Sequence, residues 1–210
     1  MHSPTSTDRP GATVLLVEDD VALSGYLGAS LRDNGYGVIF AHDRVQAMDC
    51  LKQPDAPGLV LLDLGLPPQP STMREGLAVL DEGLRINATL KVLVLTGQDE
   101  SSAAQEAVRR GAFDFLLKPV SLEAVLQALR RADLFAREEA RFARDGEARL
   151  NITARIGEGP KEAGAQAEEQ LLRRTFAAAG YNVAETARQL GLAREHVYYY
   201  LNKYGIRRPD

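Results

Sequence analysis

Short apolar runs alternate with longer segments of helical periodicity over residues 13–135. The runs at residues 14–17, 59–62, 92–95 and 113–117 are continuous in apolar character, as expected for parallel strands that are covered on both faces. Between them, leucines recur at helical spacing, for example at Leu23, Leu27 and Leu31. Strand and helix units in this order predict an α/β fold, a doubly wound five-stranded parallel sheet with two helices on one face and three on the other.

The pattern changes after residue 135. Glycines interrupt any period over residues 136–168, which predicts a linker, although residues 137–139 are also compatible with a longer last helix. Residues 169–210 are helical again. Asn182 followed by Glu185 is a capping box, Gly191 suits the end of that helix, and a second helix begins at Arg194. Two helices joined by a tight turn predict a small all-α helix-turn-helix domain.

Composition and charge fit this division. The chain has 210 residues, which suits one full domain and a small one, and its net charge is −4. Residues 171–210 nevertheless hold seven Lys or Arg against three acids, the asymmetry expected when only the tail meets a polyanion such as DNA. The single cysteine, Cys50, excludes an internal disulfide and is expected to pack in or near the core.

Neither a leader nor a membrane span is expected. Residues 1–12 are polar and contain proline, which predicts a disordered N-terminus and not a signal peptide. Apolar runs stay far below the roughly 20 residues that cross a bilayer. The expected location is therefore the cytoplasm.

The candidate chemistry lies where the apolar runs end. Glu18 and Asp19 follow the run at residues 14–17, and Asp63 follows the run at 59–62. Thr96 follows the run at 92–95, and Lys118 the run at 113–117. In an open α/β sheet, the carboxyl ends of the strands converge on one crevice. Three carboxylates, a hydroxyl and an ammonium brought together there would hold a hard divalent cation and a phosphoryl group.

Magnesium is the cation that this donor set favours, because Mg²⁺ takes oxygen ligands and keeps several waters. Asp19 and Asp63 are candidate direct ligands, Glu18 a ligand through water, and the backbone carbonyl of Gly65 a further one. The Asp63 carboxylate is the candidate nucleophile, while Lys118 would neutralise the phosphoryl oxygens. Asp20 is more simply the N-cap of the following helix than another ligand.

Residues 13–135 resemble the receiver domain of two-component response regulators, which has a flavodoxin-like fold. The resemblance implies that Asp63 is the phosphoacceptor, fed by a histidine kinase or a small phosphodonor, and that Glu18 and Asp19 bind the metal. It also implies that Thr96 and Lys118 respond to the phosphoryl group, that the peptide from Lys118 to Pro119 is cis, and that Phe115 is a switch aromatic. The alternative for Phe115 is a core position.

One departure from that family pattern follows Asp63. Gly76 lies thirteen residues beyond the aspartate, so the segment around Pro68 to Arg74 contains an insertion of about five residues. The sequence DLGLPP…EGL in this region resembles that of receivers of NtrC-class regulators. The insertion bears on the lifetime of the phosphoryl group and on the choice of partner.

Residues 182–206 resemble the Fis-type helix-turn-helix that ends NtrC-class activators. The resemblance implies one set of residues facing the DNA groove and a second set contacting phosphates. The first set is Arg194, Glu195, His196, Tyr199 and Asn202, and the second is Arg188, Lys203, Arg207 and Arg208. His196 could equally be a solvated helix residue. Tyr198 is expected to pack, and Tyr200 is a candidate dimer contact.

NtrC-class activators also carry an ATPase module, and its phosphate-binding motif is missing from this sequence. The leading interpretation is therefore a DNA-binding transcription regulator that is controlled by phosphorylation, forms a homodimer and is not an enzyme. One alternative is an adaptor whose C-terminal helices dimerise without binding DNA. Another is a metal-dependent phosphohydrolase, which the missing second acid after Asp63 disfavours.

Overall fold

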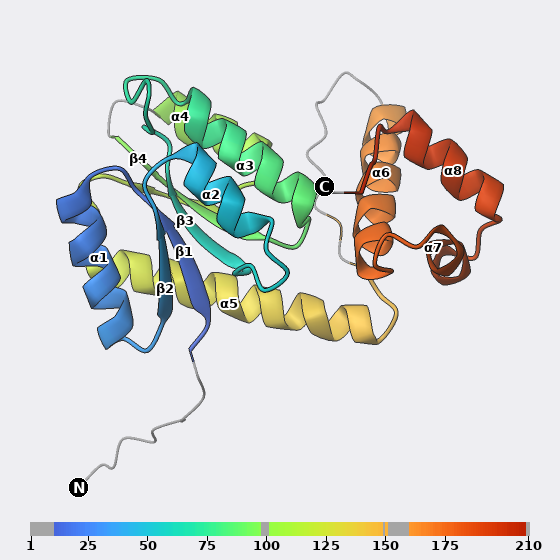
Figure 1. Ribbon diagram of the computed structural model, residues 1–210, viewed down its shortest axis with the longest axis horizontal. Helices are drawn as coiled ribbons and strands as arrows, with labels where there is room; N and C mark the ends of the chain where they lie inside the picture. Colours follow the sequence, from blue (N-terminus) through green and yellow to red (C-terminus); the bar gives the residue numbers. More distant parts are fainter. Residues whose placement is uncertain (1–10, 98–100, 149, 151–159, 209–210) are drawn as a thin grey trace, which may run out of the picture.

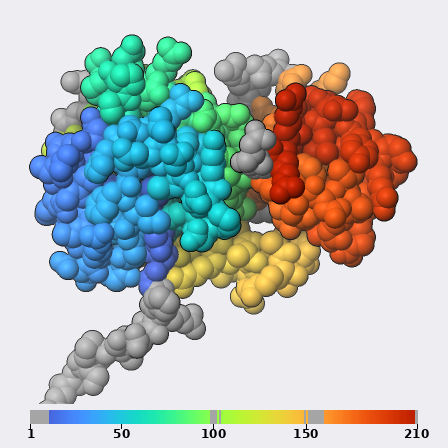
Figure 2. Space-filling view, in the orientation of Figure 1, coloured from blue at the N-terminus to red at the C-terminus, as the bar shows by residue number. Residues whose placement is uncertain are grey.

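The chain folds into an α/β lobe and a smaller helical lobe (Figures 1 and 2). A computed structural model describes residues 11–97, 101–148, 150 and 160–208, without the side chains of Ser101 and Ala103. The predicted disordered segment 1–12 therefore lies almost wholly outside the described residues. Among the described residues, none of the helices combines the length and the apolar character of a membrane span.

The α/β lobe is built on five parallel strands in the order β2-β1-β3-β4-β5, which confirms the predicted flavodoxin-like fold. The strands are β1 (Thr13–Val17), β2 (Gly37–Ala41), β3 (Leu59–Asp63), β4 (Lys91–Thr96) and β5 (Asp114–Leu117). Asp63 pairs in register with Leu95, and Thr96 with Leu117. This register brings the polar strand ends to one edge of the sheet.

Five helices cover the two faces of the sheet, two against three as predicted. They are α1 (Val21–Asp33), α2 (Arg44–Leu51), α3 (Arg74–Ile86), α4 (Ser101–Arg109) and α5 (Leu122–Arg144). Leu31 of α1 and Leu129 of α5 are buried in one core, and Leu80 of α3 and Ala107 of α4 in the other. The Asp20 side chain accepts hydrogen bonds from the backbone of Ala22 and Leu23, which confirms it as the N-cap of α1.

Gly76 lets α3 begin directly beside the end of β3. A Cβ atom on Gly76 would lie 2.4 Å from the Cα atom of Leu64 and 2.9 Å from the carbonyl oxygen of Asp63. No side chain fits in that space, so the glycine sets the distance between α3 and the segment that carries Asp63.

The helical lobe contains α6 (Pro160–Ala178), α7 (Val183–Leu190) and α8 (Arg194–Lys203). Asn182 caps α7 by accepting from the backbone of Ala184 and Glu185, and Gly191 ends it with a φ of 65°. These caps follow the sequence prediction. The core of this lobe is small and consists of Leu172, Phe176, Ala187, Val197, Leu201 and Ile206.

Both ends of the predicted linker 136–168 are helical. The last helix of the α/β lobe, α5, continues to Arg144 because Glu139 on it is held in a buried contact, and α6 begins at Pro160, well before residue 169. Proline suits the first turn of a helix, since its missing N–H has no partner there. Gly164 lies within α6 on an exposed surface, where a glycine costs only about 1 kcal/mol.

Candidate functional site

The acidic residues at the strand ends form one cluster. Glu18 and Asp19 follow β1 and Asp63 ends β3, and one carboxylate oxygen of each lies within 4.8 Å of the others. Glu18 and Asp63 are buried, and Asp19 is partly exposed. The structure thus brings together the three acids that the sequence placed at one edge of the sheet.

Lys118 bridges two members of this cluster. Its Nζ atom lies 2.8 Å from Oε2 of Glu18 and 3.0 Å from Oδ2 of Asp63. The peptide from Lys118 to Pro119 is cis, as the resemblance stated above implied. The backbone N–H of Lys118 donates to the carbonyl oxygen of Thr96 at 2.7 Å, so β4 helps to fix the lysine in the pocket.

Burial and charge act on these groups in opposite directions. Burial raises the pKa of Glu18 and the charge of Asp63 adds to this effect, although the hydrogen bond from Lys118 opposes it. Burial alone would lower the pKa of Lys118, but the hydrogen bond to Glu18 and the charge of Asp63 outweigh it and raise that pKa. Lys118 is therefore a firmly held cation beside an excess of negative charge.

Thr96, Phe115 and Gly65 are the other residues predicted for this site. Thr96 ends β4 and is 1 % exposed. Phe115 on β5 is 39 % exposed, which argues against the core alternative, whereas Phe113 packs against the core. Gly65 lies so close to Asp63 that a Cβ atom there would be 3.6 Å from Oδ2 of that aspartate.

The insertion after Asp63 folds back beside the cluster. A Cβ atom on Gly65 would lie 2.9 Å from the carbonyl oxygen of Pro70, so the loop needs glycine at this point. The backbone N–H and the hydroxyl of Thr72 both donate to the carbonyl oxygen of Gln69 at 2.9 Å. The inserted residues thus form a compact turn next to the pocket.

His42 is a residue near the pocket that the sequence analysis missed. It follows β2, the strand next to β1, and its Nδ1 atom lies 2.9 Å from the carbonyl oxygen of Glu18. Because a carbonyl oxygen only accepts, Nδ1 carries the proton in this contact. Its place directly after a strand that pairs with β1 is the signal that could have identified it.

The donor set fits a hard divalent cation. Three clustered carboxylates supply only oxygen ligands, and Mg²⁺ needs one or two of them beside water and phosphate oxygens. The repulsion among the three acids would also fall when a cation binds. Glu18, Asp19 and Asp63 are thus the side chains that would hold Mg²⁺.

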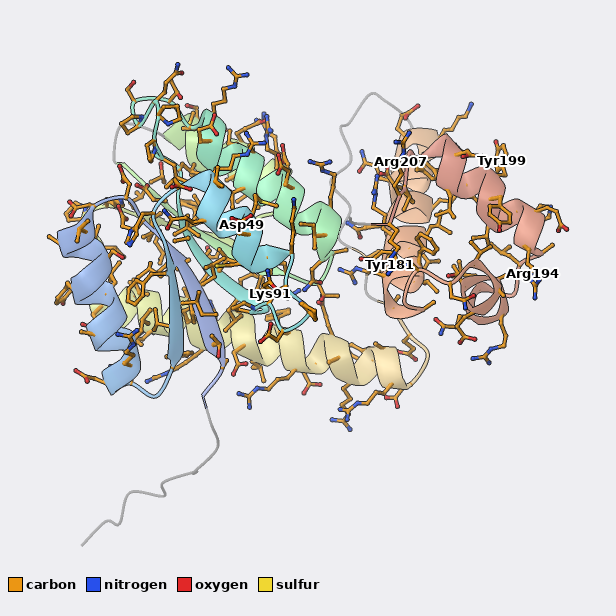
Figure 3. All side chains as sticks on the ribbon, in the orientation of Figure 1. Asp49, Lys91, Tyr181, Arg194, Tyr199 and Arg207 are labelled. Carbon is orange, nitrogen blue, oxygen red and sulfur yellow. The ribbon has the colours of Figure 1, made fainter. Side chains whose placement is uncertain are left out.

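The predicted DNA-facing residues lie on the exposed side of α8. This set comprises Arg194, Glu195, His196, Tyr199 and Asn202, and all of its members are exposed. Figure 3 shows Arg194 and Tyr199 on the outer side of the helical lobe. The expectation that Tyr198 packs is wrong, because it is 57 % exposed. Val197 and Leu201 face the core instead and turn Tyr198 away from it.

The predicted phosphate contacts are also exposed, and two of them already have partners. The Nη2 atom of Arg188 lies 2.5 Å from Oε1 of Glu185, and the Nζ atom of Lys203 lies 2.7 Å from Oε2 of Glu168. Arg207 and Arg208 follow α8 and are exposed. A basic surface therefore borders α8. DNA phosphates would have to compete with Glu185 for Arg188 and with Glu168 for Lys203.

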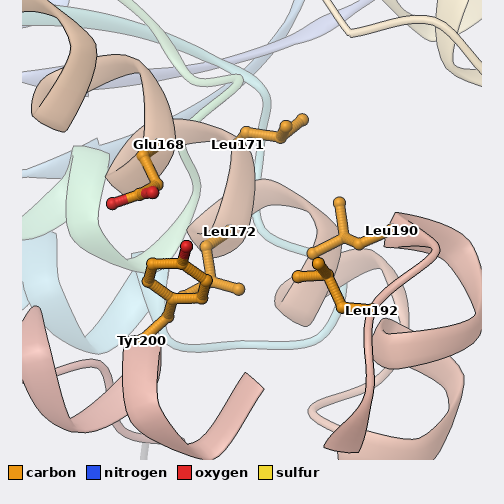
Figure 4. Close-up of a pocket in the computed structure, with 6 residues that line it drawn as sticks. All are labelled: Glu168, Leu171, Leu172, Leu190, Leu192 and Tyr200. Carbon is orange, nitrogen blue, oxygen red and sulfur yellow. The ribbon is translucent and has the colours of Figure 1, made fainter. Parts of the chain in front are cut away.

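A groove of about 220 Å³ lies between the three helices of this lobe (Figure 4). It is lined by Glu168, Leu171, Leu172, Leu190, Leu192 and Tyr200. Tyr200 reaches it from α8, so this tyrosine is engaged within its own lobe. Phe176 is 5 % exposed and belongs to the buried core of this lobe.

Comparison with known proteins identifies the α/β lobe. The family described as "Response regulator receiver domain" matches residues 14–130. "Response regulator MprA" of Mycobacterium avium (strain 104) is 37 % identical over 117 residues, which cover 56 % of this chain and 49 % of that protein. The chain thus spans about half the length of the curated relatives it matches.

Solved structures show the same similarity. The receiver domain of NtrX from Brucella abortus is 32 % identical with a TM-score of 0.52, and covers 57 % of this chain and 96 % of its own. A structure of NtrX from the same organism in complex with ADP is 27 % identical with a TM-score of 0.59. That match covers 77 % of this chain and 34 % of the NtrX chain.

Proposed function

Because the chain belongs to the response regulator receiver domain family, we propose that Asp63 is the phosphoacceptor and that the helical lobe is a DNA-binding output domain. The observation that carries the proposal is the contact of Lys118 with both Glu18 and Asp63 at one end of the sheet. A histidine kinase or a small phosphodonor supplies the phosphoryl group. The chain acts as a regulator and not as an enzyme that turns over a substrate.

The chemistry is a phosphoryl transfer to the Asp63 carboxylate. A carboxylate oxygen of Asp63 attacks phosphorus, the bond to the donor's leaving group breaks, and an acyl phosphate remains. The Lys118 ammonium neutralises charge on the phosphoryl oxygens, and the Thr96 hydroxyl donates to one of them. Bound Mg²⁺ would supply further positive charge at the same oxygens. Phe115 then changes its position as Thr96 moves.

The output is binding of double-stranded DNA through α8. Its exposed residues would reach base edges, while Arg188, Lys203, Arg207 and Arg208 would contact phosphates. The helix-turn-helix is of the Fis type found in NtrC-class activators. An ATPase module has no room between Arg144, the end of α5, and Pro160, the start of α6, so regulation would not depend on ATP hydrolysis.

We propose a homodimer as the DNA-binding form, since paired helix-turn-helix domains read two half-sites. An adaptor that pairs without DNA is the second candidate, favoured by the pairing of Arg188 and Lys203 with acids of their own lobe. Salt dependence separates the two, because DNA binding releases counterions and weakens steeply as salt rises.

One experiment tests the proposal as a whole. Intact mass, oligomeric state and affinity for double-stranded DNA are measured with and without acetyl phosphate and Mg²⁺, for the wild type and for Asp63→Asn. We expect one added phosphoryl group, a larger dimer fraction and tighter DNA binding in the wild type alone. A wild type that gains no mass, or that binds no DNA in either state, would refute the proposed function.

A further inference from the structure

Helix α6 rests against the receiver lobe, while α7 and α8 lie on its far side (Figure 1). The contact involves Arg174 of α6, whose Nη2 atom donates to the carbonyl oxygen of Ala88 at 3.2 Å. The same guanidinium lies 4.0 Å from Oε1 of Glu139 on α5. A single arginine of the helical lobe therefore reaches two segments of the receiver lobe.

Glu139 joins this arginine to a second cation. Its Oε2 atom lies 2.5 Å from Nζ of Lys91, the first residue of β4. The exposed fractions of the side chains are 4 % for Lys91, 6 % for Glu139 and 11 % for Arg174. Charges withdrawn from water in this way must keep their partners, so the contact fixes an orientation between the lobes.

The contact lies at the end of the sheet away from the acidic cluster. β4 carries Lys91 at its amino end and Thr96 at its carboxyl end. At about 3.3 Å per residue, roughly 16 Å of strand separates the two positions. Figure 3 labels Lys91 on the side of the sheet that faces the helical lobe. The docking contact and the phosphoryl pocket are thus separate sites on one rigid strand.

Docking through α6 leaves α8 uncovered. Arg194, His196, Tyr199 and Asn202 are all exposed, whereas the Arg174 side chain is mostly covered where it contacts the receiver lobe. The space-filling view likewise shows α8 on the outer surface of the smaller lobe (Figure 2). The receiver lobe therefore does not mask the proposed DNA-binding face.

We propose that the Lys91–Glu139–Arg174 contact docks the output domain on the receiver in an orientation that presents α8 to DNA before phosphorylation. The inference rests on the proposed function and deepens it by naming the form of control. Phosphorylation does not uncover α8. It changes how copies of the docked chain associate, and docking gives each copy a defined orientation for that association.

The test uses the full-length chain without phosphodonor. Small-angle scattering gives the radius of gyration, and fluorescence anisotropy gives the affinity for a labelled 30-base-pair duplex of mixed sequence at low salt. Arg174→Gln removes the charge from α6, Arg174→Lys retains it, and Lys161→Gln removes an exposed charge from the first turn of the same helix. Circular dichroism establishes that each variant is folded.

We expect Arg174→Gln to enlarge the radius of gyration, with Arg174→Lys and Lys161→Gln close to the wild type. The affinity of Arg174→Gln for the duplex should stay within about twofold of the wild type, because α8 is exposed in both forms. An unchanged radius for Arg174→Gln would overturn the docking contact. Binding that is about tenfold tighter would show that docking masks α8 and would overturn the inference.

Failure of the proposed function has a different signature. In that case none of the variants binds the duplex, with or without acetyl phosphate, and the role of docking in DNA binding is rejected too. The scattering results still decide by themselves whether Arg174 holds the two lobes together.

Discussion

The Nζ atom of Lys91 lies 2.5 Å from Oε2 of Glu139, and these two side chains are buried although 48 residues separate them in the chain. Lys91 begins β4, and Glu139 lies on the part of α5 beyond residue 130, where the family match ends. A residue outside the common receiver domain thus neutralises a buried cation inside it.

Replacing Glu139 by glutamine should destabilise the chain strongly. Lys91 would remain buried without a counter-ion, which lowers the free energy of unfolding by roughly 3–5 kcal/mol. Urea unfolding measures this change. Glu138→Gln is the matched control, since Glu138 is exposed and its loss should change stability by less than about 0.5 kcal/mol. Equal losses in the two variants would contradict a stabilising role for the pair.

Replacing Lys118 by methionine should slow phosphoryl transfer to Asp63 but increase the stabilisation of the chain by Mg²⁺. The variant loses the cation between Glu18 and Asp63, and phosphorylation by acetyl phosphate should slow roughly a hundredfold. Mg²⁺ should raise its melting temperature more than that of the wild type, because the clustered acids then lack another cation. Mass spectrometry and thermal unfolding measure the two effects.

The exposed Lys52, just beyond α2, provides the control as Lys52→Met. That variant should keep both the phosphorylation rate and the response to Mg²⁺ of the wild type. A smaller Mg²⁺ response in Lys118→Met than in the wild type would show that the lysine does not compete with the metal.

Gly76→Ala should displace α3 from the end of β3. The new Cβ atom would lie 2.4 Å from Cα of Leu64, so the helix must shift, at a cost of about 1–3 kcal/mol of stability. Because Leu64 follows Asp63 directly, phosphorylation should slow as well. Denaturant unfolding and the rate of mass gain measure these losses.

Gly25→Ala on α1 is the control for this substitution. A Cβ atom on Gly25 meets nothing within 4 Å, so alanine should leave phosphorylation unchanged and stabilise the helix by about 0.5–1 kcal/mol. If both variants lose stability equally, the close approach of α3 at Gly76 is not the cause.

Arg194→Ala and Arg207→Ala should weaken DNA binding in different ways. The duplex for this test is selected from a random pool by the wild-type chain. Loss of Arg194 should cost about 1–3 kcal/mol on that duplex and relax its sequence preference. Loss of Arg207 should weaken all duplexes alike and reduce the salt slope by about 1. Identical behaviour of the two variants would contradict their assignment to base and phosphate contacts.

Much of the pocket could be predicted from the sequence because parallel topology brings strand ends together. Glu18, Asp63 and Lys118 each follow an apolar run, so their convergence followed from the fold. The ends of α7 were equally predictable, since Asn182 and Gly191 act through contacts within a few residues.

The contact between the lobes could not be predicted in this way. Lys91, Glu139 and Arg174 meet through tertiary packing, and no local pattern singles out one charged residue among many. The extent of α5 has the same origin, because Glu139 holds that part of the helix in place. The start of α6 did leave a signal, a proline suited to the first turn, which the glycines nearby obscured.

The length of α5 has a thermodynamic consequence. Its first half packs in the receiver core through Val125 and Leu129, and its second half carries Glu139 to the small lobe. A domain with so few buried side chains is only marginally stable alone. Docked on a shared helix, it should melt with the receiver in a single calorimetric transition, so we expect the two lobes to share one stability although they differ in shape.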